Sequence, residues 1–264
     1  MQMIDAVLDV LMMNSVLLFV VIFVLMLGSA LVGKYLFKER LQDDALADDD
    51  SKIVLGALLS LLFLLMGFSL SIAISGYNAR EQTEEQEAIV IANAIQNTEM
   101  LTEADRQRAY PLLKDYLETR IAFFNSGSHI YSSDLQRKSI EIQKALWKIA
   151  LEEARTSTVN GYSLLLTSYT ELYNTQARTT AGWRDLIPGS AWVLLIILSI
   201  SANYFIGHNI RGVRGRNTLI MILPTLTTLA LFMISEIDVP GEGVIYVVPD
   251  NLIALNRIFI PPVH

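Results

Sequence analysis

The stretch that decides the fold is residues 53–75, IVLGALLSLLFLLMGFSLSIAIS, which contains no Asp, Glu, Lys, Arg or His. A helix of about 20 apolar residues crosses the hydrocarbon core of a bilayer, so this stretch predicts a transmembrane helix. Three further stretches share its apolar character and its lack of ionisable residues: 16–33, 191–207 and 218–235. The sequence therefore predicts an all-α integral membrane protein with four transmembrane helices.

The overall composition excludes several classes of function. Hydrophobic residues make up 52% of the 264 residues, charged residues only 18%, and the net charge is −7. Such a chain lacks the clustered Lys and Arg that neutralise nucleic-acid phosphates, so we expect no nucleic-acid partner. It has no cysteine, its three histidines are scattered, and it carries no serine elbow, metalloprotease or phosphate-loop motif. We therefore expect no metal, no cofactor and no enzymatic activity.

Lys and Arg near the ends of the apolar stretches indicate the orientation, because short cytoplasmic loops are rich in these residues. Residues 34–52 contain four of them and residues 208–217 contain three, whereas residues 1–15 contain none and residues 236–264 contain one. This pattern predicts that both termini lie outside the cytoplasm. The long segment 76–189 then lies outside as well, because the chain crosses the membrane twice before reaching it.

These boundaries divide the chain into four parts. We expect transmembrane helices 1 and 2 in residues 1–75, an extracytoplasmic helical bundle in 76–189, transmembrane helices 3 and 4 in 190–235, and an extracytoplasmic tail in 236–264. Residues 78–100 contain no Gly or Pro, so the second transmembrane helix should continue outward as one long helix. A β-branched run at residues 243–248 is the one possible strand.

Two helices of the predicted bundle have apolar residues at helical spacing, which indicates one buried stripe on each. The first stripe contains Leu135, Ile142, Leu146, Ile149 and Ala150, and the second contains Tyr162, Leu165, Leu166, Tyr169, Leu172 and Tyr173.

The second apolar stretch carries small and polar residues on one helical face. Gly56, Ser60 and Gly67 recur at the spacing that lets membrane helices approach closely, so we interpret them as helix-packing residues. A sharper hypothesis places hydroxyl and amide groups along a water-filled path around an oligomer axis, with Leu70 and Ile74 as an apolar constriction. The candidate pore-lining residues are Ser69, Leu70, Ser71, Ile74, Ser75 and Asn78. A proton-coupled carrier is disfavoured, because no stretch contains an ionisable residue.

Charged residues follow the second and fourth stretches. Arg80 lies beyond the second, and Glu236 and Asp238 lie beyond the fourth, on the same side of the membrane in the predicted topology. An ion pair between Arg80 and Asp238 would clamp the two helices together. In the alternative, a ring of Arg80 side chains at a pore mouth would concentrate anions. Glu84, Glu85 and Glu87 predict a helix face in contact with solvent.

Residues in both halves of the chain carry a family resemblance. In the first half they are Gly67, Phe68, Ser69, Tyr77, Arg80, Glu87, Ala88, Leu101, Tyr116 and Arg120, and in the second Pro188, Trp192, Asp238, Pro240, Gly243 and Ile245. Together they resemble the bestrophin-like family of bacterial membrane proteins. The resemblance implies kinship with bestrophins, which are pentameric four-span anion channels with apolar constrictions on the second span. Bestrophins keep their termini in the cytosol, opposite to the orientation that the charge count predicts here.

We therefore expect a homo-oligomer, by resemblance a pentamer, in the inner membrane of a bacterium. Its partners would be the lipid bilayer, further copies of the chain and inorganic anions. The predicted function is an ion channel for anions whose second span lines the path. The alternative is a non-conducting scaffold or sensor whose extracytoplasmic bundle binds a partner or an envelope component.

Overall fold

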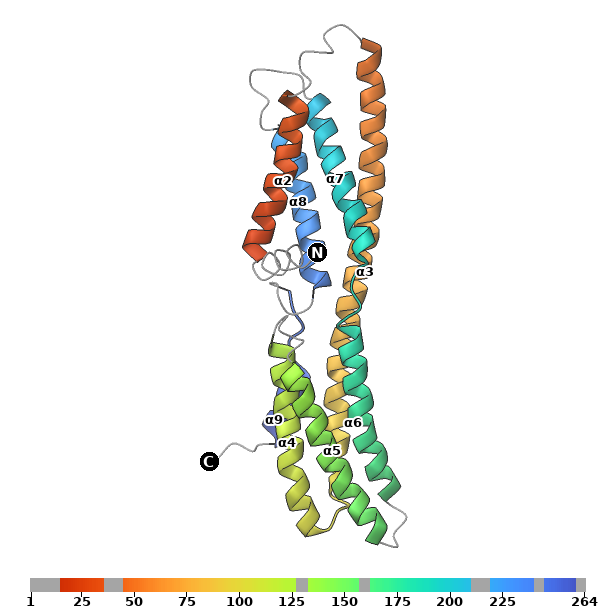
Figure 1. The fold of residues 1–264 in the computed structure, drawn as a ribbon, viewed down its shortest axis with the longest axis vertical. Helices are drawn as coiled ribbons and strands as arrows, with labels where there is room; N and C mark the ends of the chain where they lie inside the picture. Colours follow the sequence, from red (N-terminus) through yellow and green to blue (C-terminus); the bar gives the residue numbers. More distant parts are fainter. Residues whose placement is uncertain are drawn as a thin grey trace. The chain divides into compact units, whose positions relative to one another are not determined.

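The structure is a computed structural model that describes residues 15–35, 45–126, 133–156, 162–209, 219–239 and 245–259. Within these ranges the chain forms helices and connecting segments and no strand, which confirms the predicted all-helical fold class (Figure 1). The possible strand at 243–248 is wrong for residues 245–248, which form no regular element and lead into the last helix. Several residues used for the predicted topology and the resemblance lie outside the described ranges: 1–14, Arg211, Arg214, Arg216, Pro240 and Gly243.

The helices of the described ranges are α2 Ser15–Tyr35, α3 Ala45–Thr98, α4 Glu103–Asn125, α5 Ser133–Thr156, α6 Tyr162–Gly182, α7 Gly189–Asn209, α8 Leu219–Asp238 and α9 Asp250–Phe259. Helix α3 is continuous over 54 residues, which confirms the prediction that the second apolar stretch extends as one helix. The chain divides into two compact units. Unit 1 contains residues 1–75 and 186–245, and unit 2 contains residues 76–185 and 246–264.

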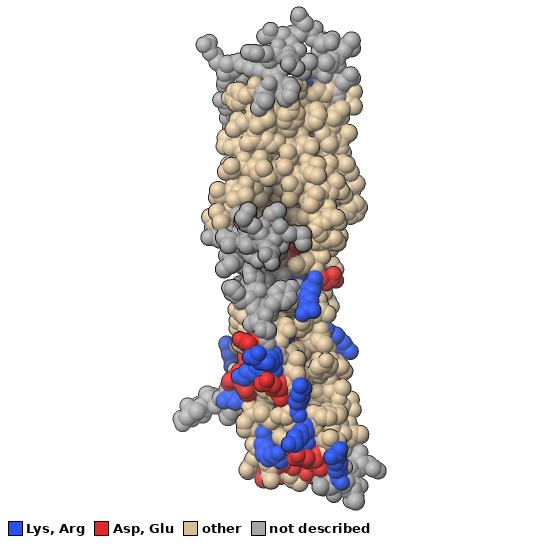
Figure 2. Space-filling model, viewed as in Figure 1, with Lys and Arg blue, Asp and Glu red and all other residues tan. Residues whose placement is uncertain are grey.

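Unit 1 holds α2, the first part of α3, α7 and α8. Four helices in the described part of the chain are long and apolar enough to cross a membrane, and they carry the four apolar stretches. Their shared core includes Met26 of α2, Leu62 of α3, Leu195 of α7 and Leu231 of α8. Large apolar side chains cover the outside as well, and the described surface of this unit is almost free of charge in Figure 2. An apolar exterior of this kind is stable in lipid and not in water.

Unit 2 holds the second part of α3, together with α4, α5, α6 and α9. Helix α5 packs against α4 and α6, and α9 packs against α4. The predicted stripe of α5 is confirmed, since Ile142, Leu146, Ile149 and Ala150 are buried in the core. In the stripe of α6, Leu165, Tyr169 and Leu172 are buried, whereas Tyr173 is exposed. Figure 2 shows Lys, Arg, Asp and Glu gathered on the surface of this unit.

Candidate functional site

The predicted pore-lining residues lie on two different sides of α3. Leu70, Ser71, Ile74, Ser75 and Asn78 are exposed, and the exposed fractions of Leu70 and Ile74 are 36% and 44%. Such exposure in a single chain leaves these side chains open to lipid, to water or to another copy. The face they form is therefore one of the exposed parts of α3 that a neighbouring chain or a water-filled path could contact.

Ser69 differs from the other five candidates. Its side chain is only 6% exposed, and it lies on the same stripe as Leu62, Met66 and Ala73, which are buried in the core of unit 1. These positions are three, four or seven residues apart, so they share one face of the helix. Ser69 thus faces the helices of its own chain.

The predicted helix-packing residues Gly56, Ser60 and Gly67 are also exposed. A Cβ atom built on Gly56 or Gly67 would meet nothing within 4 Å. The Ser60 hydroxyl donates a hydrogen bond to the Gly56 carbonyl one turn earlier, at 2.9 Å. The role of these residues in helix packing stays a prediction. Because they are exposed among the described residues, such packing would be against another chain.

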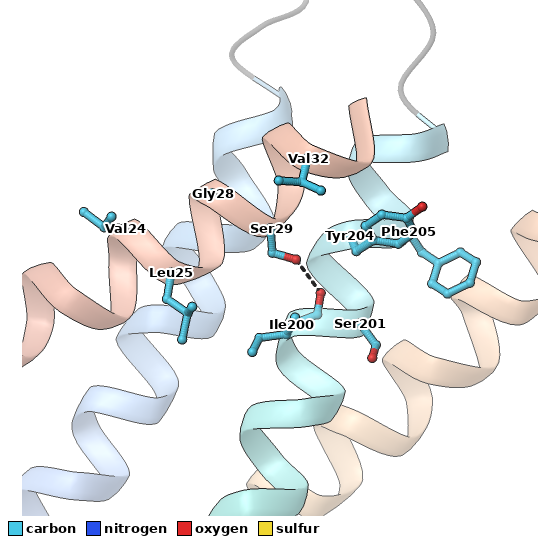
Figure 3. Close-up of a pocket in the computed structure, with 9 residues that line it drawn as sticks. All are labelled: Val24, Leu25, Gly28, Ser29, Val32, Ile200, Ser201, Tyr204 and Phe205. Atoms are coloured by element: carbon cyan, nitrogen blue, oxygen red, sulfur yellow. Dashed lines mark hydrogen bonds between the residues drawn. The ribbon is translucent and has the colours of Figure 1, made fainter. Parts of the chain in front are cut away.

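A close helix contact that sequence reasoning missed lies between α2 and α7. A Cβ atom on Gly33 would overlap with the backbone carbonyl of Tyr204, and one on Gly207 would overlap with the carbonyl of Ala30. Only glycine permits such an approach at both positions, so the backbone of each helix packs directly against the glycine of the other. Figure 3 shows α2 and α7 near this contact. The small residues Ala30 and Gly33 at the end of the first apolar stretch were the available signal.

Asn203 joins three helices inside the same contact region. It is fully buried, and its amide nitrogen lies within hydrogen-bonding distance of the Ser199 carbonyl at 2.8 Å and the Thr227 hydroxyl of α8 at 3.1 Å. The sulfur of Met26 in α2 is 3.5 Å from the same nitrogen. Polar contacts of this kind hold membrane helices together where lipid provides no hydrophobic driving force.

Asp238 ties the end of α8 to the start of α7. Its carboxylate accepts hydrogen bonds from the backbone N–H of Ile187 at 3.0 and 3.3 Å, and from the indole N–H of Trp192 at 3.4 Å. The donors precede α7 or lie in its first turn, where backbone N–H groups lack partners within the helix and a negative charge is favourable. Two residues of the family resemblance, Trp192 and Asp238, thus meet in one contact.

Arg80 and Glu236, the other two candidates for an ion pair or a pore mouth, are both buried. Arg80 belongs to unit 2, whereas Glu236 and Asp238 belong to unit 1. The ion pair between Arg80 and Asp238 and the ring of Arg80 side chains both stay predictions.

A buried ion pair lies in the core of unit 2. The Arg120 guanidinium donates two hydrogen bonds to the Glu87 carboxylate, Nε to Oε2 at 2.6 Å and Nη2 to Oε1 at 2.7 Å. The side chains are 0% and 2% exposed, and the guanidinium stacks on the Phe123 ring at 4.3 Å. The predicted solvent-facing role of Glu84, Glu85 and Glu87 is therefore wrong for Glu84 and Glu87, which are buried, and correct for Glu85. The reason is that partners from α4 and from the residues after Asp250 cover that side of α3.

Polar groups of α4, α5 and α6 form a buried network around Tyr116. The Tyr116 hydroxyl donates to the Leu172 carbonyl at 3.2 Å and accepts from the Gln143 amide at 3.0 Å, and that amide also donates to Gln176 at 2.6 Å. Burial raises the pKa of the Tyr116 hydroxyl. Burial also opposes the charge of Arg120, but the attraction of Glu87 and its hydrogen bonds raise the pKa of the guanidinium. These groups hold fixed protonation states and specify one packing of the three helices.

Glu84 binds the start of α9. Its Oε1 accepts a hydrogen bond from the backbone N–H of Leu252 at 2.9 Å, and its Oε2 accepts one from the Asn251 amide at 2.7 Å. The carboxylate thus satisfies a backbone N–H that has no partner within α9. Tyr110 of α4 packs against Phe259 at the other end of α9, with ring centroids 5.7 Å apart.

In the described residues, no group of three or more His, Cys, Asp or Glu side chains is placed to hold a metal ion. Comparison with curated proteins and with solved structures gave no match. The family model described as Bestrophin-like domain matches residues 20–252, which covers α2 from residue 20 onward, the other three apolar helices and the contacts of Glu87, Arg120 and Asp238. The chain belongs to the bestrophin-like family.

Proposed function

We propose that the chain forms a homo-oligomeric anion channel in the inner membrane of a bacterium, with the exposed face of α3 lining the path. The bestrophin family includes anion channels, and this kinship supports anion conduction as the proposed function. By the same kinship the oligomer is a pentamer. The residues assigned to the path are Leu70, Ser71, Ile74, Ser75 and Asn78, whereas Ser69 is omitted because it faces its own chain.

The observation that carries the proposal is the polarity of the exposed side of α3. Ser71 and Ser75 are exposed on a helix that is otherwise apolar enough to span a membrane. Hydroxyl groups gain nothing from contact with lipid tails, whereas water or another chain can hydrogen-bond to them. An arrangement of several copies around an axis would bring this face to water, with Leu70 and Ile74 as the apolar constriction.

The contacts within unit 2 support the proposed four-span topology. Glu84 binds the backbone of Leu252, and α9 packs on α4, which supports a position of unit 2 on one side of the membrane. Such a position requires an even number of crossings between residues 76–185 and 246–259, and α7 and α8 provide two. The ion pairs on the surface of unit 2, such as Arg137 with Asp134 and Lys138 with Asp115, favour a position in water. The Lys and Arg count supports the proposal that this side is outside the cytoplasm.

The experiment that tests the proposal uses the absence of cysteine in the native chain. Purified protein is reconstituted in liposomes, chloride flux is measured, and single variants Ser71→Cys, Ser69→Cys and Ile72→Cys are treated with a charged methanethiosulfonate reagent. Only a thiol in contact with water reacts, because the thiolate is the nucleophile. We expect modification and a change in flux for Ser71→Cys and none for Ser69→Cys. Ile72→Cys is the matched control, since Ile72 is exposed but lies away from the Ser71 face.

The absence of flux in protein that reconstitutes as an oligomer would overturn the proposal and favour the scaffold or sensor. Flux that persists while all three thiols react equally would show that α3 does not line the path. Both outcomes leave the family assignment and the fold unchanged, because these do not depend on conduction.

A further inference from the structure

Three buried polar atoms in unit 2 have no hydrogen-bond partner among the described residues. They are Nη1 of Arg120 on α4, and Oγ of Ser139 and Oε1 of Gln143 on α5. Their residues are 0%, 0% and 6% exposed. A buried polar group without a hydrogen bond costs free energy, so each atom requires a partner that the described chain does not supply. We propose that these atoms bind an ordered internal water at the contact of α4 with α5.

The helices α4 and α5 lie side by side and run in opposite directions (Figure 1). The Nη2 atom of Arg108 lies 3.7 Å from the Glu152 carboxylate. Eight residues further along α4, the Tyr116 hydroxyl accepts a hydrogen bond from the amide of Gln143 at 3.0 Å. Rising residue numbers on α4 therefore meet falling residue numbers on α5.

Arg120 and Ser139 lie one helical turn away from the contact of Tyr116 with Gln143. Residues four positions apart share one face of a helix, so Arg120 follows Tyr116 on the same face of α4. Ser139 precedes Gln143 on the same face of α5 for the same reason. Because the helices are antiparallel, both steps lead in the same direction along the contact. The three atoms without partners therefore lie along one stretch of the α4–α5 contact.

The ion pair with Glu87 fixes the direction of Arg120 Nη1. Glu87 accepts hydrogen bonds from Nε at 2.6 Å and from Nη2 at 2.7 Å, so the carboxylate occupies one edge of the guanidinium. The guanidinium is planar and its N–H groups form a rigid fork, which leaves Nη1 on the side opposite that carboxylate. The Phe123 ring lies over the face of the guanidinium at 4.3 Å. The N–H groups of Nη1 thus have a fixed direction, away from Glu87.

The mixture of donor and acceptor atoms identifies the ligand as water. Nη1 of Arg120 can only donate a hydrogen bond, Oε1 of Gln143 can only accept one, and the Ser139 hydroxyl can do both. An anion could accept from Nη1, but it would face the Gln143 oxygen, and Glu87 already balances the charge of Arg120. A water molecule accepts from Nη1 and donates to Oε1. Buried waters typically make about three hydrogen bonds to polar groups that the protein leaves unsatisfied.

The water completes the hydrogen bonding around three residues of the family resemblance, Glu87, Tyr116 and Arg120. It joins the ion pair of α3 and α4 to the Tyr116 network of α4, α5 and α6 through Gln143, which donates hydrogen bonds to Tyr116 and Gln176. The inference requires only the packing within unit 2. It is therefore independent of ion conduction and of the orientation in the membrane.

The test measures magnetisation transfer from water to the arginine side chains by solid-state NMR. Full-length protein with 15N-labelled arginine is reconstituted in liposomes, and the signals that disappear in Arg120→Lys are assigned to Arg120. The ion pair holds the guanidinium in one orientation, so Nε, Nη1 and Nη2 should give separate signals. We expect transfer to Nη1 to build up several-fold faster than transfer to Nε, which is bonded to Glu87.

Two substitutions at one position separate a bound water from the Ser139 hydroxyl. Ser139→Ala removes the hydroxyl and leaves room for the water, so we expect the transfer to Nη1 to persist. Ser139→Val fills the site with methyl groups, and we expect the transfer to Nη1 to fall to the level of Nε. An unchanged Nε signal in this variant would show that the ion pair with Glu87 is intact. If Ser139→Val does not fold, the wild type and Ser139→Ala still decide the question.

Four results would overturn the proposal. Transfer to Nη1 no faster than to Nε in the wild type would mean that no water is bound there. Loss of the transfer in Ser139→Ala would identify the hydroxyl as its source, and full transfer in Ser139→Val would place the water elsewhere. A shift of the Nη1 signal with chloride concentration would identify an anion as the ligand.

Discussion

Replacing Glu87 by leucine leaves the Arg120 guanidinium charged and without its partner in the core of unit 2. Arg120 is fully buried, and its Nε and Nη2 both donate hydrogen bonds to the Glu87 carboxylate. Removing one member of a buried ion pair costs about 3–5 kcal/mol, because the remaining charge stays out of water. We expect a loss of this size in Glu87→Leu and again in Arg120→Met.

The double variant should behave differently from the sum of the two single variants. Replacing both members by apolar residues of similar size is often neutral and can stabilise by about 1–4 kcal/mol, because no buried charge remains. Arg120→Met also loses the stacking on Phe123 at 4.3 Å, worth about 0.5–2 kcal/mol. That loss occurs in both the single and the double variant, so it cancels from the coupling energy. We expect a coupling energy of at least about 3 kcal/mol.

The measurement is pulse proteolysis of the full-length protein in detergent across a series of urea concentrations. It reports the free energy of unfolding for the wild type, both single variants and the double variant. Additive effects, with a coupling energy below about 1 kcal/mol, would refute the reasoning, because that is the value of an ion pair exposed to water.

Three further results are expected from unit 1, unit 2 and the proposed path. Gly33→Ala brings a methyl group into the carbonyl of Tyr204 and should destabilise the folded protein by about 1–3 kcal/mol in a thermal-unfolding assay. The control Gly28→Ala should not destabilise it, because a Cβ atom at Gly28 meets nothing within 4 Å. Equal effects of the two variants would argue against the close crossing of α2 and α7. Burial raises the pKa of the Tyr116 hydroxyl in the folded protein. The neutral hydroxyl therefore contributes its full stabilisation below the pKa of tyrosine in the unfolded chain, about 10, and this stabilisation is lost as the pH rises further. Tyr116→Phe should therefore reduce the loss of the urea midpoint above about pH 10, and an identical loss would exclude this tyrosine as the cause. Ile74→Ser should raise chloride flux several-fold in liposomes by wetting the constriction, and unchanged flux would place the barrier elsewhere.

Features that depend on local chemistry could be predicted from the sequence. The stretch 53–75 is apolar over enough residues to span a bilayer, and the absence of Gly and Pro after residue 78 allows the same helix to continue to Thr98. The stripe with Ile142 and Leu146 follows the helical repeat, so its burial could be predicted without knowledge of the partners.

Contacts between distant positions could not be predicted in this way. Glu87 and Arg120 are 33 residues apart, and nothing beside Glu87 distinguishes it from the exposed Glu85. One partner of Asp238 is the backbone N–H of Ile187, which no side-chain pattern reveals. Gly33 owes its role to a backbone carbonyl of another helix. In the proposed channel, Ser71 contacts water or another chain, and the neighbouring residues of the sequence encode neither contact.

The binding of α9 by Glu84 has a consequence for biosynthesis. Unit 2 joins residues that precede α7 with residues that follow α8, and Glu84 and Leu252 are separated by 168 positions. While the ribosome is still making α8, the carboxylate of Glu84 has no N–H from α9 to accept, and unit 2 is incomplete. In the proposed four-span topology, its completion waits until α7 and α8 have entered the membrane and returned the chain, so a nascent copy would finish this unit only after its membrane insertion is complete.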